Sequence, residues 1–395
     1  MKEAILPIGY RGGVASAAIK KPGRLDMCLI LSDSPASAAG VFTKNLVKAA
    51  PVLLNMERLK KGIARAILAN SGNANACTGD QGLRDAVVLS EALGKALSIS
   101  EDEILVASTG VIGQRLPLDR MVQAIPELVK GLSTEGLPKV AEAILTTDKF
   151  PKIAFHKGSI GGRDYTIYGI AKGAGMIMPH MATMLCFVLT DLGLSSKELH
   201  GALLEGVDKS FNRITVDGDT STNDMVLALA NGLVGNGALK SHELSSFQDG
   251  LTSVLKSLSE MIVRDGEGAT RLVRVKVVGA SKDSEAEAAS RTIANSLLVK
   301  TAIFGEDPNW GRIMAALGRS GCAFDPHKVD IYIGGVKIVE NGLGLGQEAE
   351  EKAKAQMKGD ELELVVDLKR GNSDREILTC DLTYEYVKIN AEYRT

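Results

Sequence analysis

The residues most able to do covalent chemistry lie in the segment KGAGMIMPHMATML, which runs from Lys172 to Leu185. A glycine-rich turn and a proline lead to Ala182 and Thr183, and the apolar run behind them, residues 184–190, predicts a buried strand. Threonine is a weak nucleophile at its free pKa, and a neighbouring N-terminal amine is a recognised way of activating it. The segment therefore suits a threonine that attacks the carbonyl of Ala182, cuts the chain and frees its own α-amino group.

Such a cut would divide the chain into residues 1–182 and 183–395. The new α-amine has a reference pKa of about 7.7–8.0, close enough to neutrality for it to take a proton from its own hydroxyl. Neither a histidine nor a carboxylate partner is then obligatory, and cleavage must precede turnover because a peptide-bonded nitrogen cannot act as the base. The alternative is an ordinary strand-edge threonine that is hydrogen-bonded to the backbone.

Length, charge and hydropathy limit the class of protein. A chain of 395 residues predicts two domains, or one large layered unit, with a substantial core. Charged residues make up 24% and the net charge is −2, so no strong field favours nucleic acid or a membrane surface. No apolar run approaches the ~20 residues of a membrane span, and the N-terminus lacks the apolar core of a secretion signal. We therefore expect a soluble, cytoplasmic protein with no nucleic-acid or membrane partner.

Metal and cofactor motifs fail on their spacing. Five cysteines lie far apart without a CxxC pair, so we expect buried thiols rather than disulfides or a zinc site: Cys28, Cys77, Cys186, Cys322 and Cys380. The acidic stretch 217–224 lacks the sixth-position glycine and twelfth-position glutamate of a calcium loop, and we expect a structural turn and a helix start there. The spacing of Gly173 and Gly175, and of the glycines at 342–346, does not fit a dinucleotide fingerprint. The sequence predicts no metal and no bound cofactor.

Hydrophobic periodicity predicts strands and helices interspersed along the chain, which is typical of an α+β protein with stacked layers. The predicted strands are residues 66–69, 104–107, 165–170, 184–190, 272–278, 329–333 and 362–368. The predicted helices are residues 83–97, 199–207, 251–262 and 288–300, and Ser195 with Glu198 forms a capping box before the second. The stretch 131–162 resembles a connection, and the small, charged stretch 279–287 could separate a core of about 1–280 from a C-terminal domain of about 281–395.

Motifs along nearly the whole chain resemble the ornithine acetyltransferase family, the bifunctional glutamate N-acetyltransferases of the arginine pathway. Besides the segment around Thr183, they are Asn70–Gly79, Ser108–Gly113, Thr146–Asp148, Thr215–Asp224, Arg264–Thr270, Phe304–Arg312 and Asn390–Thr395. The resemblance implies the layered α-β-β-α-type core of a self-processing fold, formed jointly by both halves of the cut chain. It also implies a smaller C-terminal α/β domain and assembly into an α2β2 heterotetramer.

The resemblance also implies roles for individual residues. Thr183 is the nucleophile, and Thr109 with Gly110 forms the oxyanion hole, where fixed donors typically contribute about 2.7–4 kcal/mol each. These two residues follow a predicted strand, and an ordinary strand-to-turn cap is the alternative interpretation. The catalytic site therefore needs no imidazole, although His180 is close to Thr183 in the sequence.

The positions that match the substrate contacts of the family are Thr146, Lys172, Thr183, Glu267, Asn390 and Thr395. The ammonium of Lys172 suits a substrate α-carboxylate as a point charge. Glu267 stands between glycines that permit close approach, and its carboxylate suits the ammonium of ornithine or glutamate. Without the resemblance, Lys172 would be interpreted as a solvated loop residue and Glu267 as part of a helix C-terminal turn.

The resemblance implies ping-pong transfer of acetyl from N²-acetyl-L-ornithine to L-glutamate through an acetyl-threonine ester. Some members also accept acetyl-CoA as a co-substrate, and no adenine- or pyrophosphate-binding motif decides whether this chain does. Two alternatives stay open. A related self-cleaving aminopeptidase would use water as the acceptor and need no glutamate site, and a non-enzymatic binding protein would keep its chain intact.

Overall fold

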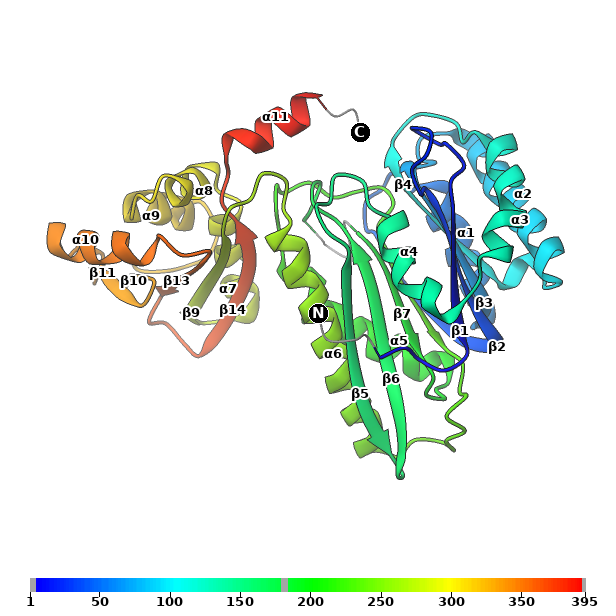
Figure 1. Cartoon of the computed structure of the whole chain (residues 1–395). Coiled ribbons are helices and arrows are strands. Elements are labelled where there is room, and N and C mark those ends of the chain that lie inside the picture. The colour runs from blue at the N-terminus through cyan, green and yellow to red at the C-terminus, as the bar shows by residue number, and fades with distance from the viewer. Residues whose placement is uncertain (1–4, 179–183, 393–395) are drawn as a thin grey trace. The chain divides into compact units, whose positions relative to one another are not determined.

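The computed structural model describes residues 5–178 and 184–392 (Figure 1). Ala182, Thr183, His180 and Thr395 therefore lie outside the described residues. The described chain divides into two compact units. Unit 1 comprises the residues up to Asn212 together with Asp219–Ile262, and unit 2 comprises Arg213–Gly218 and the residues from Val263 onward.

Unit 1 is built on one eight-stranded mixed sheet of strand order β4-β3-β2-β8-β7-β6-β5, with β1 paired to β2. Its strands are β1 (Tyr10–Ala15), β2 (Met27–Phe42), β3 (Ile63–Asn73), β4 (Ile104–Val111), β5 (Lys152–Ile160), β6 (Arg163–Lys172), β7 (Leu185–Thr190) and β8 (Met225–Ala230). The pairs β3–β4 and β7–β8 are parallel, and the other neighbours are antiparallel.

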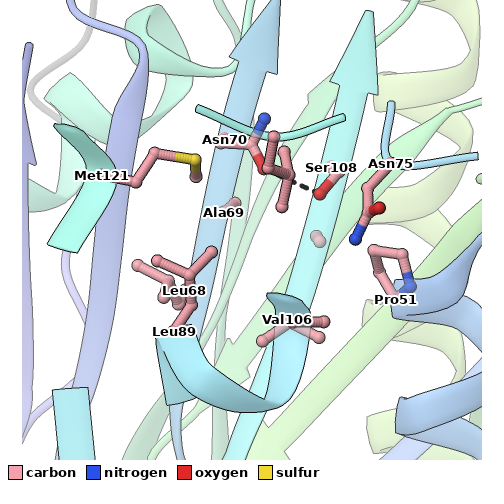
Figure 2. Close-up of a pocket in the computed structure, with 12 residues that line it drawn as sticks. Pro51, Leu68, Ala69, Asn70, Asn75, Leu89, Val106, Ser108 and Met121 are labelled. Carbon is pink, nitrogen blue, oxygen red and sulfur yellow. Dashed lines mark hydrogen bonds between the residues drawn. The ribbon is translucent and has the colours of Figure 1, made fainter. Parts of the chain in front are cut away.

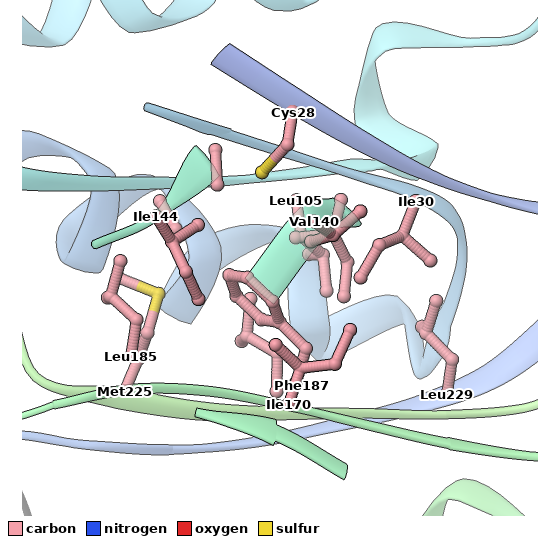
Figure 3. Close-up of a cluster of buried hydrophobic side chains, with 14 of the residues drawn as sticks. Cys28, Ile30, Leu105, Val140, Ile144, Ile170, Leu185, Phe187, Met225 and Leu229 are labelled. Atoms are coloured by element: carbon pink, nitrogen blue, oxygen red, sulfur yellow. The ribbon is translucent and has the colours of Figure 1, made fainter. Parts of the chain in front are cut away.

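The two halves of this sheet face each other across a shared apolar core. The long strand β2 belongs to both halves, because its first part pairs with β3 and its last part pairs with β8, with a register shift between Leu31 and Ala36. Figure 3 shows Ile30 on the side of β2 opposed to Ile170 and Phe187 from β6 and β7. All three side chains are at most 1% exposed. Burial of large apolar side chains contributes about 1.5–3 kcal/mol each, so this core holds the halves together.

Helices cover the outer faces of both halves. The helices of unit 1 are α1 (Ala50–Arg58), α2 (Gly79–Leu97), α3 (Leu118–Lys130), α4 (Leu137–Ala143), α5 (Ser196–Asp208) and α6 (Ser241–Arg264). Leu93 of α2 and Leu128 of α3 pack against β1–β4 in a second buried cluster. On the other side, α6 lies so close to β6 that a Cβ on Gly169 would meet Leu258 at 2.7 Å. The order is α-β-β-α, which confirms the predicted fold class.

Unit 2 has its own six-stranded sheet, of order β12-β11-β10-β13-β9-β14, and its own buried core. The strands are β9 (Leu272–Ala280), β10 (Asp330–Ile333), β11 (Val336–Glu340), β12 (Leu343–Gly344), β13 (Glu361–Asp367) and β14 (Ser373–Cys380). The helices are α7 (Asp283–Ala294), α8 (Leu297–Phe304), α9 (Trp310–Gly318), α10 (Gln347–Gln356) and α11 (Tyr384–Glu392). The expected boundary near residue 280 falls inside this unit, because β9 pairs with both β13 and β14.

The predicted strands all coincide with observed ones, and three of the four predicted helices do so as well. The fourth, residues 288–300, is wrong as a single helix. The chain breaks at Asn295 and Ser296, where the Ser296 side chain accepts a hydrogen bond from the backbone N–H of Val299 and so caps the start of α8. The stretch 131–162 is more ordered than a connection, because it contains α4 and the edge strand β5.

Two smaller predictions also need correction. The acidic stretch 217–224 leads into the strand β8 rather than into a helix. Its following residues, Met225–Ala230, are all buried, and a continuous apolar run of this length fits a strand that is covered on both faces. Four of the five cysteines are buried as expected, but Cys77 is exposed in the turn before α2.

We predict that Ser195→Ala destabilises unit 1 through α5. The Ser195 hydroxyl accepts from the backbone N–H of Glu198, and the Glu198 carboxylate accepts from the backbone N–H of Ser195, so the predicted capping box is present. Losing such a cap costs about 0.5–2 kcal/mol, or ~2–4 °C in Tm for each kcal/mol in a domain of this size. Ser257→Ala, an exposed substitution within α6, is the matched control and should change Tm little in calorimetry.

Candidate functional site

The ends of three strands meet at one edge of the unit 1 sheet. Lys172, the last residue of β6, pairs with Leu185, the first residue of β7, and Leu185 pairs with Met225, the first residue of β8. The predicted nucleophile Thr183 is two residues before Leu185 in the sequence and lies outside the described residues. Met184, the residue after Thr183 in the sequence, directly precedes β7 at this edge.

The side chain of Lys172 joins two other predicted site residues. Its Nζ donates to Thr146 Oγ1 at 2.8 Å and to Thr109 Oγ1 at 3.2 Å. The Lys172 side chain is 10% exposed, so it is not the solvated loop residue of the alternative interpretation. Three residues that were predicted from separate motifs are thus joined by hydrogen bonds of one ammonium group, that of Lys172.

The carboxylate of Asp148 lies next to this cluster and interacts with both of its neighbouring lysines. Its carboxylate accepts from Lys152 Nζ at 2.8 Å and from the backbone N–H groups of Gly173 and Thr146, at 2.6 Å and 3.0 Å. Lys172 Nζ is 3.9 Å from the same carboxylate. Burial alone would raise the pKa of Asp148, but Lys172 and Lys152 outweigh it and hold that pKa well below its usual range.

The group of Lys152, Asp148 and Lys172 has a consequence for the ligand. Lys152 and Asp148 are fully buried and paired, which is how proteins accommodate charges away from water. Lys172 lies at the least buried end of the group. An ammonium in this position suits an anionic group such as a carboxylate. Sequence reasoning had assigned no role to Asp148, although it closes the motif Thr146–Asp148.

Thr109 and Gly110 lie at an irregularity in the sheet. The strand β4 does not turn at this pair, as the sequence had suggested, but runs on to Val111. The irregularity is in the facing strand, where the register shifts between Gly72 and Asn73. Gly110 has φ 132°, and a Cβ there would meet the Gly72 carbonyl carbon at 2.3 Å. Only glycine fits this close approach, and such bulges often re-aim groups beside active sites.

Buried amide side chains hold this strand end in place. Asn223 Nδ2 donates to the backbone oxygens of Ser108 at 2.8 Å and Ala74 at 2.6 Å. Ser108 Oγ donates to Asn70 Oδ1 at 2.7 Å, the bond that is dashed in Figure 2. The small pocket in that figure lies between β3, β4 and the helices above them and is lined mainly by apolar side chains such as Leu68 and Val106. Its lining includes none of Lys172, Thr109 and Thr146.

Two further predicted residues meet within unit 2. Asn390 Nδ2, on α11, donates to Glu267 Oε2 at 2.8 Å. Glu267 is 6% exposed, although it lies in a turn after α6. The neighbouring Gly268 has φ 72°, and a Cβ there would meet the backbone nitrogen of Tyr386 at 2.5 Å. The glycine therefore permits α11 to approach this carboxylate closely. Thr395 lies outside the described residues.

Residues 5–178 and 184–392 contain neither a candidate metal site nor a helix that could span a membrane. Within these ranges no three His, Cys, Asp or Glu side chains are grouped so that they could hold a metal ion. In the same part of the chain, every helix is too short or too polar to cross a bilayer.

Comparison with known proteins agrees with the sequence motifs. The model of the ArgJ family matches residues 11–395. The arginine biosynthesis bifunctional protein ArgJ of Desulfotalea psychrophila is 51% identical over 389 residues, which are 98% of this chain and 99% of that protein. The protein of the same name from Geobacter sulfurreducens is 50% identical with the same coverage. A crystal structure of the arginine biosynthesis bifunctional protein argJ from Bacillus halodurans is 45% identical, with a TM-score of 0.51, over 53% of this chain and 100% of that chain.

We predict that Asp148→Asn destabilises unit 1 by about 3–5 kcal/mol at neutral pH, because it removes the carboxylate of a buried ion pair with Lys152. The folded pKa of Asp148 is lowered, so its contribution is present above the unfolded pKa of ~3.9 and is lost as the pH falls below it. Urea unfolding of wild type and Asp148→Asn, at neutral pH and at a pH below ~3.9, measures the difference in the free energy of unfolding.

The matched control is Asp164→Asn, which removes an exposed pair with Lys157 and should leave the unfolding midpoint unchanged. If the difference in unfolding free energy between wild type and Asp148→Asn were just as large in acid, the claim that Asp148 is charged in the folded protein would be contradicted.

Proposed function

This chain belongs to the ArgJ family, and on that premise we propose that it is a self-cleaving acetyltransferase of arginine biosynthesis. In this proposal it transfers acetyl from N²-acetyl-L-ornithine to L-glutamate by a ping-pong mechanism with Thr183 as the nucleophile. The observation that supports it best is the convergence of Lys172, Thr109 and Thr146 at the sheet edge from which the chain leads back to Thr183.

The first step in the proposal is intramolecular. The Thr183 hydroxyl attacks the Ala182 carbonyl, the acyl group moves from nitrogen to oxygen, and water hydrolyses the resulting ester. The products are residues 1–182 and residues 183–395 with a free α-amine on Thr183. This amine is the base that activates the hydroxyl in every later turnover.

The second step forms the acetyl-enzyme. The Thr183 hydroxyl attacks the acetyl carbonyl of N²-acetyl-L-ornithine, and Thr109 and Gly110 stabilise the oxyanion that develops. The Thr109 hydroxyl accepts a hydrogen bond from Lys172 and so keeps its own proton available for the oxyanion. Collapse of the tetrahedral intermediate releases ornithine and leaves an acetyl ester on Thr183.

The third step consumes the ester. The amine of L-glutamate attacks the acetyl carbonyl, which regenerates the Thr183 hydroxyl and gives N-acetylglutamate. Lys172 is the proposed partner of the substrate α-carboxylate, and Thr146 holds the ammonium of Lys172 in place. Glu267 and Asn390 are proposed ligands of the substrate, with the Glu267 carboxylate the partner for a substrate ammonium, and Thr395 is a further proposed contact.

The two fragments should remain together after cleavage. The strand β6 belongs to the first fragment and β7 to the second, yet they pair from Ile167 with Thr190 to Lys172 with Leu185. Both strands also contribute to the interior core, so separation would expose buried apolar surface. We propose that two such pairs form an α2β2 heterotetramer.

The self-cleavage is tested on a denaturing gel. The wild-type chain should give two fragments, whose junction at Ala182–Thr183 is checked by mass spectrometry, and Thr183→Ala should stay intact because it lacks the hydroxyl. Thr183→Ser keeps a hydroxyl and is the matched control, so it should still cut. A wild-type chain that never divides yet transfers acetyl at full rate would contradict the mechanism.

We also propose that acetyl-CoA is a second acetyl donor, since the relatives carry the name bifunctional. Purified enzyme should form N-acetylglutamate from glutamate with either N²-acetyl-L-ornithine or acetyl-CoA. Both activities should disappear in Thr183→Ala if one nucleophile serves both donors. Activity with acetyl-ornithine alone would make the enzyme monofunctional and refute this part of the proposal.

A further inference from the structure

Asp224 is a buried acid for which the proposed mechanism has no use so far. It directly precedes β8 and is 1% exposed. One of its carboxyl oxygens, Oδ2, has no hydrogen-bond partner among the described residues. Burial raises the pKa of Asp224 well above its usual range, against smaller opposing effects of Ser221, the Met184 backbone and Lys172. Burial therefore favours the protonated form of this carboxyl.

The position of Asp224 relates it to the predicted cleavage point. The next residue, Met225, pairs with Leu185, and its backbone N–H donates to the Met184 oxygen at 3.1 Å. The Asp224 carboxyl itself lies beside the Met184 backbone N–H and the Ser221 hydroxyl. Met184 follows Thr183 in the chain, and consecutive Cα atoms are ~3.8 Å apart. Asp224 therefore contacts the backbone of the residue that directly follows Thr183 in the sequence.

Self-cleavage needs a proton donor that later turnover does not. When the Thr183 hydroxyl attacks the Ala182 carbonyl, the leaving group is an amide nitrogen. That nitrogen departs readily only once it has gained a proton, and transfer from a positioned acid contributes typically 10²–10⁴-fold. The α-amine that serves the later steps does not yet exist, so the proton must come from another group.

The other charged groups near this sheet edge are less suited to the task. Asp148 has a pKa well below its usual range and holds no proton at neutral pH. Lys172 donates to Thr109 and Thr146 and faces Asp148, and Lys152 is paired with Asp148. Lys172 is also the charged group that faces Asp224. Asp224 lies at the same edge, and its Oδ2 is without a hydrogen-bond partner in the described part of the chain.

We propose that Asp224 is the proton donor to the leaving nitrogen of Thr183 in self-cleavage, an inference that rests on the proposed function. The Thr183 Oγ–C bond forms, the C–N bond of the Ala182–Thr183 peptide breaks, and the proton of Asp224 passes to the nitrogen. The proton that leaves the Thr183 hydroxyl returns through water to the Asp224 carboxylate. The acid is thereby restored, and the products are the ester and a neutral α-amine.

This role explains an otherwise unfavourable feature of the core. An unpartnered oxygen on a buried carboxyl costs free energy. Donation of its proton during self-cleavage would account for an aspartic acid at this buried position.

The test follows freshly synthesised full-length chain in cell-free translation, with the two fragments quantified over time on a denaturing gel. Asp224→Asn keeps the shape of the side chain but has no acidic proton, and it should cut about 10²–10⁴-fold more slowly than wild type. The matched control is Asp191→Asn at the far end of β7, which changes an equally buried aspartate that accepts from the backbone N–H groups of Thr166 and Ile8. It should cut at the wild-type rate even if it is less stable.

A second measurement separates proton donation from a packing role. Samples start at one common pH and are shifted to a series of final pH values, where the rate of cleavage is measured. The wild-type rate should fall as the final pH rises through the raised pKa of Asp224. Asp224→Asn should not show this decline at alkaline pH. If Asp224→Asn cut at the wild-type rate, or if wild-type cleavage accelerated steadily with pH, the role of Asp224 would be refuted while the proposed function would stand. If Asp224→Asn does not fold, the wild-type pH profile decides. A wild-type chain that never cuts would instead remove the proposed function.

Discussion

The site depends on the register of three neighbouring strands. Because Lys172 pairs with Leu185 and Leu185 pairs with Met225, β6 ends and β7 and β8 begin at the same sheet edge. A shift by one residue would turn every side chain of a strand to the opposite face, so the register is fixed by the apolar core between the sheet halves. In the sequence, residues 173–184 connect the paired strands β6 and β7, and they contain the proposed cleavage point.

Electrostatics then divides the buried acids of this edge into two kinds. Asp148 is surrounded by lysines and backbone N–H groups and stays charged, so it orders the cluster around Lys172. Asp224 is also buried, but there burial outweighs the opposing effect of Lys172 and raises the pKa, which favours the neutral form. A charged acid can position a cation, whereas a neutral acid can give up a proton. Two aspartates with different surroundings thus fit two different tasks, one in substrate binding and one in maturation.

Much of the fold could be predicted from the sequence, because apolar periodicity marks elements that are covered on both faces, such as β7 and β8. The break between α7 and α8 was missed, because Ser296 is an acceptable helix residue whose capping role appears only when Val299 is placed. The sequence motifs also indicated Thr109, Thr146 and Lys172. They could not indicate Asp148 or Asp224 as functional, because a carboxylate has a role only through its neighbours, and these come from distant parts of the chain.

The central claim is that Thr183 carries the acetyl group between donor and acceptor. It is tested most directly by mixing the processed enzyme with N²-acetyl-L-ornithine in the absence of glutamate, quenching with acid and mapping the acetylated peptide by mass spectrometry. The account predicts one acetyl group, located on the first residue of the 183–395 fragment and removed when glutamate is added before the quench. Acetyl found on any other residue, or an enzyme that turns over without a covalent acetyl intermediate, would contradict it.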